Sequence, residues 1–218
     1  MEILIIVIVL IFVFILLIAL ISSFKSSGSG IESPERRFGR KGEQRVANEL
    51  DALAKRYGGY LFNNYCFKDK QGYSCEIDHI LITKGGVFII ETKSNKGKVK
   101  GTASDENWLC LKSNYEIKTF KNPTKSNQGH INHLGYMIYP KKIKFYSLVI
   151  FPYADISLVN AYDVYTLESA INRIDNQSRD GDYSDHFVNE MHQILKNILS
   201  IHGISVNEHI ENIKSKHS

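Results

Sequence analysis

The fold of this chain is constrained most by two apolar runs, residues 75–82 and 87–93, that flank a short Lys-Gly-Gly segment. Apolar runs of this length on either side of a glycine turn predict two β-strands joined by a tight turn. The first strand then carries Asp78, and the second carries a Glu-x-Lys pair, Glu91 and Lys93. We therefore expect these three charged side chains to converge.

The second strand is predicted to place charged groups on an apolar face. The two-residue period of a strand puts Glu91 and Lys93 on the same side as Val87 and Ile89. An acid and a lysine are costly to bury there unless they pair or bind a cation, so their position indicates a functional site. Solvated strand ends also carry such residues, and these positions alone do not decide between the two interpretations.

Two carboxylates and a lysine form the set used by metal-dependent phosphodiesterases. Hydrolysis of a phosphodiester adds negative charge to the phosphoryl oxygens, and a divalent cation held by hard carboxylate oxygens neutralises that charge. Asp78 and Glu91 are the expected ligands of Mg²⁺ or Mn²⁺. Lys93 is expected to hold the attacking water or to stabilise the transition state.

Several sequence blocks occur in the order found in one known family. Over residues 38–138 the chain resembles the nuclease-related domain (NERD) family, and the ordered set is more specific than any one block. The blocks are residues 39–50, 76–82 and 86–93, and the pair Asn122-Pro123 ahead of Gly129-His130.

The resemblance implies an α/β restriction-endonuclease-like fold, with a mixed sheet flanked by helices. In that fold an Asp and a Glu-x-Lys on adjacent strands are joined by an acid from a preceding helix. The corresponding positions in this chain are Asp78, Glu91, Lys93 and Glu43. The sequence also supports Glu43 independently, because it precedes a helical apolar stripe that includes Val46 and Leu50.

One position departs from the family pattern. A glutamine is usual three residues after the proline of the Asn-Pro pair, and this chain has Ser126 there. Gln128 lies about 200° further around a helix, so it is a poor substitute. The intact Asp78, Glu91 and Lys93 favour catalysis, whereas Ser126 favours a non-catalytic module that binds nucleic acid or a protein partner. An enzyme acting on another phosphodiester is a third possibility.

The N-terminal region contains a second strong signal, the uncharged apolar run of residues 3–21. A helix of this length spans about 28 Å, close to the thickness of a bilayer's hydrocarbon core. No basic side chain precedes the run and no Ala-x-Ala-like site follows it, so we favour a retained anchor over residues 1–24 rather than a cleaved signal peptide. Basic residues follow the run, which predicts a single-pass protein of the cell membrane with a cytoplasmic C-terminal domain.

The Ser/Gly-rich composition after the anchor predicts a flexible linker over residues 25–37, and residues 38–218 have the size of one domain with a C-terminal helical extension. We expect strand and helix to alternate, as in an α/β sandwich. Besides the two strands already described, the expected elements are helices at 41–57, 123–138 and after a Ser184 cap, strands at 98–102, 108–112, 115–118 and 144–151, a two-residue turn at Ser113-Asn114, and a short helix or tail at 204–218.

The charge pattern bears on nucleic-acid binding, and the spacing of cysteines and histidines bears on zinc binding. The net charge of +4 is below that of a strongly basic nucleic-acid binder, but lysines follow the predicted site. We expect Lys96, Lys98, Lys112 and Lys118 to contact phosphates without reading bases. Three cysteines without Cys-x-x-Cys spacing do not indicate a zinc ribbon, and His130 and His133 have no neighbouring Cys or His partners. The sequence thus predicts a membrane-tethered, Mg²⁺- or Mn²⁺-dependent nuclease whose partner is nucleic acid, most simply DNA.

Overall fold

The computed structural model describes residues 33–215 of the chain. The chain divides into two compact units, Met1–Arg37 and Phe38–Ser218, and the second contains the site. The predicted membrane helix and most of the predicted linker lie outside the described residues. Among residues 33–215, no helix is long and apolar enough to cross a membrane.

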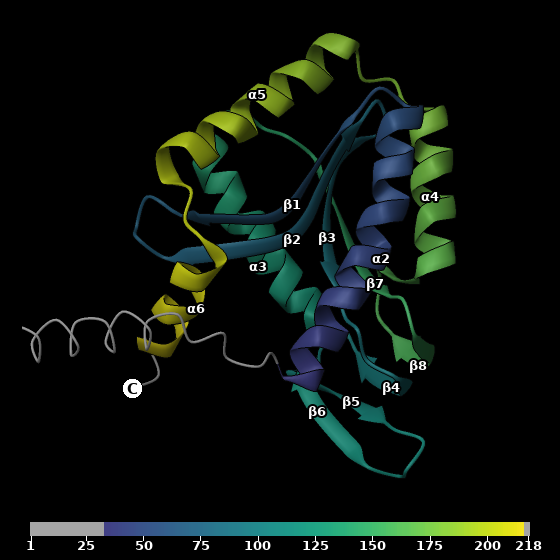
Figure 1. Cartoon of the computed structure of the whole chain (residues 1–218). Coiled ribbons are helices and arrows are strands. Elements are labelled where there is room, and N and C mark those ends of the chain that lie inside the picture. The colour runs from purple at the N-terminus through teal and green to yellow at the C-terminus, as the bar shows by residue number, and fades with distance from the viewer. Residues whose placement is uncertain (1–32, 216–218) are drawn as a thin grey trace, which may run out of the picture. The chain divides into compact units, whose positions relative to one another are not determined.

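Within residues 33–215, six consecutive strands follow the first helix, three more follow the next helix, and three helices come last, so strand and helix do not alternate one by one as the sequence predicted (Figure 1). In chain order the elements are α2 (Pro34–Arg56), β1 (Tyr60–Lys68), β2 (Ser74–Thr83), β3 (Gly86–Thr92), β4 (Gly97–Thr102), β5 (Asn107–Leu111), β6 (Ile117–Lys121), α3 (Pro123–Ile138), β7 (Phe145–Phe151), β8 (Ala154–Asn160), β9 (Val164–Thr166), α4 (Leu167–Arg179), α5 (Asp185–His202) and α6 (Val206–Ser215).

The strands form two mixed sheets, which confirms the predicted α/β class with helices flanking mixed sheets. The larger sheet has the order β1-β2-β3-β7-β9, with antiparallel pairs up to β3 and parallel pairs beyond it. The smaller sheet has the order β6-β5-β4-β8, and its β4–β8 pair is parallel. The strands β4, β5 and β6 were expected from the sequence, but their pairing into a second sheet was not, and neither were β1, β8, β9 and α4.

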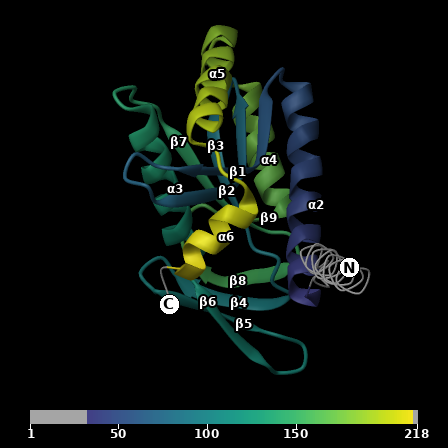
Figure 2. The ribbon, with the colours of Figure 1, turned by 60° about the vertical axis from the view of Figure 1, so that its left-hand side comes forward.

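Two apolar cores cover opposite faces of the larger sheet. One core joins it to α3 and α5, and the other joins it to α2 and α4 (Figures 1 and 2). In β3, Val87 and Ile89 belong to the first core, and Phe88 and Ile90 belong to the second. The predicted alternation of side chains along β3 is therefore confirmed. By the same two-residue period, Glu91 lies on the face of β3 that is covered by α3.

Several boundaries differ from the sequence-based expectations, and two of the differences have a clear local cause. Helix α2 begins at Pro34, so the last residues of the predicted linker are helical. Ser33 accounts for this start, because its hydroxyl accepts a hydrogen bond from the Arg36 N–H at 3.3 Å and Pro34 has the fixed φ suited to a first helical turn. The β5–β6 turn also includes Tyr115, which has a φ of 63°, because the Lys112 N–H bonds to the Glu116 carbonyl.

Candidate active site

A bend in the β1–β2 pair places Asp78 where the ladder between β2 and β3 stops. Ile77 and Ile80 are three residues apart and still pack in the same core, so strict alternation of side chains is broken between them. The partner strand β1 is also irregular here, because Asn64, which lies between the partners of Ile77 and His79, has a φ of 50°. The last β2–β3 pair is His79 with Ile90, so Asp78 lies just past the end of this ladder.

Asp78 turns its carboxylate across the gap to β3. Its Oδ2 accepts a hydrogen bond from the Thr92 N–H at 2.7 Å. Burial raises the pKa of Asp78 well above its usual range, and the negative charge of Glu91 raises it further. The two acids that were predicted to converge therefore do so, near the end of β3 and beside the middle of β2, where the β2–β3 ladder stops.

Glu91 lies between two basic side chains. Its Oε1 is 2.5 Å from Nζ of Lys93, and its Oε2 is 3.5 Å from Nδ1 of His130 on α3. The Glu91 side chain is only 7% exposed, whereas that of Lys93 is 32% exposed. Burial would lower the Lys93 pKa, but the neighbouring acids, Glu91 above all, raise it overall, so Lys93 is an ammonium at neutral pH.

Helix α2 brings Glu43 to the same acids. A Cβ on Gly42 would lie 1.9 Å from the Ser94 hydroxyl oxygen, so the lack of a side chain allows the helix to approach the β3–β4 connection. Burial raises the pKa of Glu43, with further contributions from Glu76 and Glu91. Glu43, predicted from the helical stripe and from the resemblance, therefore joins the cluster.

Glu76 is a fourth acid of this cluster and was not among the predicted site residues. Burial and then Glu91 raise its pKa. The signal that would have found it is its position two residues before Asp78 on the same strand, where side chains share a face. We refer to Glu43, Glu76, Asp78 and Glu91 as the acid cluster.

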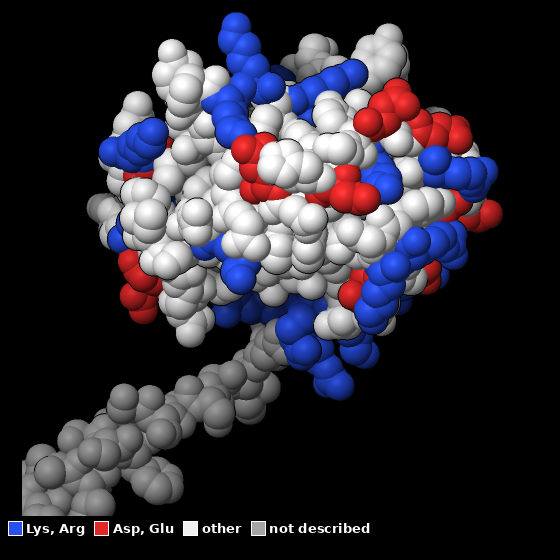
Figure 3. Space-filling view, turned by 90° about the horizontal axis from the view of Figure 1, so that it is seen from above, with Lys and Arg blue, Asp and Glu red and all other residues white. Residues whose placement is uncertain are grey.

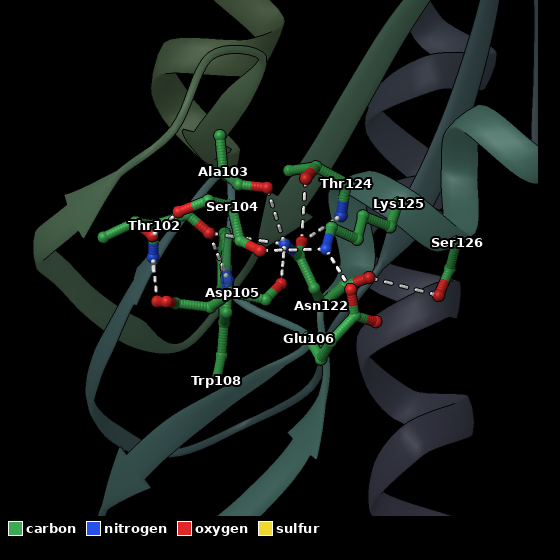
Figure 4. Close-up of polar contacts among 10 residues, drawn as sticks. All are labelled: Thr102, Ala103, Ser104, Asp105, Glu106, Trp108, Asn122, Thr124, Lys125 and Ser126. Atoms are coloured by element: carbon green, nitrogen blue, oxygen red, sulfur yellow. Dashed lines mark hydrogen bonds and ion pairs between the residues drawn. The ribbon is translucent and has the colours of Figure 1, made fainter.

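Helix α3, which carries His130, is positioned by Asn122 (Figure 4). The two hydrogens of the Asn122 amide are shared among three carbonyl oxygens at the end of β4 and in the β4–β5 connection, at 2.7 Å from Asp105 and 3.3 Å from Thr102 and Ala103. The Asn122 side-chain oxygen caps the helix by accepting from the Thr124 N–H at 3.0 Å. The Asn-Pro pair therefore fixes where α3 starts, and with it the height of His130 beside Glu91.

Ser126, which replaces the usual glutamine, lies one helical turn before His130. Its hydroxyl donates a hydrogen bond to the Asn122 carbonyl at 3.2 Å, within the first turn of α3 (Figure 4). Gln128 bonds to Asn132 on the exposed side of the helix and does not take the role of the missing glutamine.

Two further histidines, His79 and His133, have partners outside the acid cluster. Nδ1 of His79 lies 2.7 Å from Oδ1 of Asn63, and burial lowers the His79 pKa to about 4. Nδ1 of His133 lies 2.7 Å from Oδ2 of Asp69. His133 and His130 thus contact different acids, and His79 serves as a neutral core residue.

The predicted phosphate-binding lysines do not share one surface. Lys118 pairs across the strands with the buried Cys110, so it projects from the inner face of the smaller sheet. Lys98 pairs with the exposed Leu111 on the outer face and lies 3.2 Å from Asp155.

The other two predicted lysines lie at the ends of strands. Nζ of Lys112 lies 2.9 Å from Glu116 in the β5–β6 turn, and Nζ of Lys96 lies 4.7 Å from the centre of the Phe38 ring. On the face seen from above in Figure 3, basic and acidic side chains are interspersed and no continuous basic surface is visible.

The donor chemistry of the acid cluster fits a hard divalent cation, although the side chains do not form a closed cage. Within residues 33–215, no group of three or more His, Cys, Asp or Glu side chains is arranged to hold a metal ion. Mg²⁺ is commonly bound by only one or two carboxylates, together with water and substrate phosphates. The raised pKa values of the acids reflect burial and unneutralised negative charge, which a cation would relieve.

Comparison with known proteins agrees with this geometry. The family described as "Nuclease-related domain" matches residues 38–152, which is more than half of the chain. An uncharacterized protein of Bacillus anthracis is 32% identical over 102 residues, which cover 46% of this chain and 46% of that protein. The chain thus spans about half the length of this relative. No solved structure matches the chain.

Proposed function

Because the chain belongs to the nuclease-related domain family, we propose that it hydrolyses phosphodiester bonds of nucleic acid, with DNA as the substrate and Mg²⁺ or Mn²⁺ as cofactor. The proposal includes a restriction-endonuclease-like organisation of the larger sheet. The observation that carries it is the Lys93–Glu91 contact of 2.5 Å at the end of β3, beside Asp78 of β2.

This arrangement is hard to explain as a structural device alone. The acid cluster holds four carboxylates, and burial followed by their mutual repulsion raises the pKa of three of them, so burying these groups together lowers the stability of the fold. Stable folds rarely keep such groups unless a ligand uses them. A cation and a phosphodiester are the ligands that match several acids beside one ammonium.

Each residue has a defined part in the proposed reaction. Asp78 and Glu91 would hold the divalent cation, which supplies Lewis-acid stabilisation of the phosphoryl oxygens. The Lys93 ammonium donates hydrogen bonds to the attacking water or to a developing oxyanion, since its raised pKa prevents it from acting as a general base. Glu43 orients a water at the edge of the cluster.

We also propose that the domain is tethered to the cell membrane, facing the cytoplasm. The support comes from the sequence, namely the apolar run of residues 3–21 and the basic residues that follow it. A tether of this kind would restrict substrates to nucleic acid near the membrane.

One observation favours a second candidate, a non-catalytic module that binds nucleic acid or a protein on the same scaffold. The Ser126 hydroxyl is bonded within its own helix, so the position of the usual glutamine contributes no amide to the site. A family member that had lost turnover would show such a change.

The full-length protein incubated with supercoiled plasmid, linear DNA and RNA separates these candidates. We expect cleavage with Mn²⁺ or Mg²⁺, none with EDTA, and none by an Asp78→Asn variant that folds normally. Nucleic-acid binding without cleavage would support the second candidate. Neither cleavage nor binding under any of these conditions would contradict the nuclease proposal.

A further inference from the structure

The C-terminal helix α6 lies beyond the family match and still packs beside the acid cluster. It contacts β2 and β1, and Figure 2 shows it in front of β2 next to α3. A backbone hydrogen bond holds the segment before α6 against β1, because the Ile204 N–H donates to the Cys66 carbonyl at 3.2 Å. Lys68 and Glu208 form an ion pair of 2.7 Å across the same contact.

This helix docks through a histidine instead of an apolar residue. His209 is its one buried residue among those described and is 8% exposed, whereas Val206 and Ile213 are 37% and 44% exposed. Nδ1 of His209 is buried without a hydrogen-bond partner. An unpaired buried nitrogen costs free energy that a leucine at the same position would avoid.

The other nitrogen of this ring faces the acid cluster. Nε2 of His209 lies 3.8 Å from Oε2 of Glu76. This separation is longer than a hydrogen bond, and hydrogen bonds in active sites are often long before substrate arrives and tighten in the reactive complex. Glu76 in turn acts electrostatically on Glu43 and is itself affected by Glu91.

We propose that His209 is a positioning residue of the active site, and that α6 completes this site by holding the Glu76 carboxylate toward the acid cluster. The inference rests on the proposed nuclease function. Neutral His209 donates its Nε2–H to Glu76, which already has a hydrogen bond with the Cys66 thiol, and the two contacts together fix one carboxylate rotamer. Partners of this kind commonly change activity ten- to a hundred-fold when removed.

Two substitutions separate positioning from packing. His209→Leu fills the same space, removes the unpaired nitrogen and cannot donate, whereas His209→Gln keeps an N–H donor near the position of Nε2. We expect His209→Leu to lower kcat on plasmid DNA by about ten- to a hundred-fold with little change in KM and no loss in the urea midpoint. His209→Gln should recover much of this loss, and Ile213→Ala on the same helix should behave as wild type.

The results distinguish the two levels of the proposal. If His209→Leu cleaves at the wild-type rate, or if the leucine and glutamine variants are equally impaired, the positioning role is wrong while the nuclease function stands. If the wild-type protein cleaves no nucleic acid under any metal condition, the proposed function fails and the role of His209 fails with it.

Discussion

The Lys93–Glu91 pair supports a prediction about both stability and turnover. In a Lys93→Met variant the side chain keeps its approximate length and loses its charge, which leaves Glu91, 7% exposed, without its closest cation. Removing one partner of a buried ion pair costs about 3–5 kcal/mol. Lys93 is 32% exposed, so solvent screens part of the interaction and we expect a loss of about 1–3 kcal/mol.

A double-mutant cycle isolates this pairing. Glu91→Gln removes the stranded charge, so the double variant should regain most of the stability that Lys93→Met alone loses. The coupling free energy, measured by urea unfolding of the four proteins, should be about 1–3 kcal/mol. Lys100→Met provides the control. Because Lys100 is exposed on the smaller sheet, this variant should change neither the free energy of unfolding nor the cleavage rate.

Turnover should respond differently from stability. Lys93→Met should lower the single-turnover cleavage rate by about a hundred-fold, or about 2.7 kcal/mol of barrier, and the double variant should not recover it. Substrate binding should remain, because Lys93 is proposed to act in the transition state. Equal single-turnover rates for wild type and Lys93→Met, or stability effects that simply add, would refute the assigned role.

Three further measurements check other parts of the structure. Lys118→Ala should weaken nucleic-acid binding and reduce its salt slope by about one, whereas Lys98→Ala on the opposite face should leave both unchanged; equal effects would contradict the assigned faces. The His79 pKa is lowered to about 4, so stability is full above about pH 6.5 and should fall by about 1.4 kcal/mol per pH unit as the pH drops toward 4. The difference in free energy of unfolding between wild type and His79→Gln, measured by urea titration at each pH, should show this slope. A difference that does not change with pH would contradict it. Gly101→Ala would place a Cβ 2.3 Å from a buried tryptophan ring and should cost about 1–3 kcal/mol in thermal unfolding, unlike Gly135→Ala, which meets open space.

Local features of the sequence predicted the elements whose signals are short-range. The expected helix at 123–138 has the bounds observed for α3, because Asn122 caps it and a proline suits its first turn. Ser184 caps α5 as expected, by accepting a hydrogen bond from the Phe187 N–H. In each case the determinant lies within four residues of the feature that it predicts.

Parts of the fold without such signals were missed. The strands β1, β8 and β9 carry mixed or partly exposed side chains, and their pairing depends on strands that are distant in sequence. The turn expected at Ser113-Asn114 extends to Tyr115, whose positive φ is not one that a tyrosine favours. Tertiary context overrode the local preference there.

The sequence by itself determined the residues that a strand period or a helical stripe brings together. Asp78, Glu91 and Lys93 lie on two strands joined by a short turn, so their convergence follows from local geometry. The tertiary structure alone decided that Glu76 meets His209, that His130 approaches Glu91, and that Lys98 and Lys118 lie on opposite faces. The physical reason is that these relations depend on how helices dock and how a second sheet pairs, and neither is encoded in the spacing of neighbouring residues.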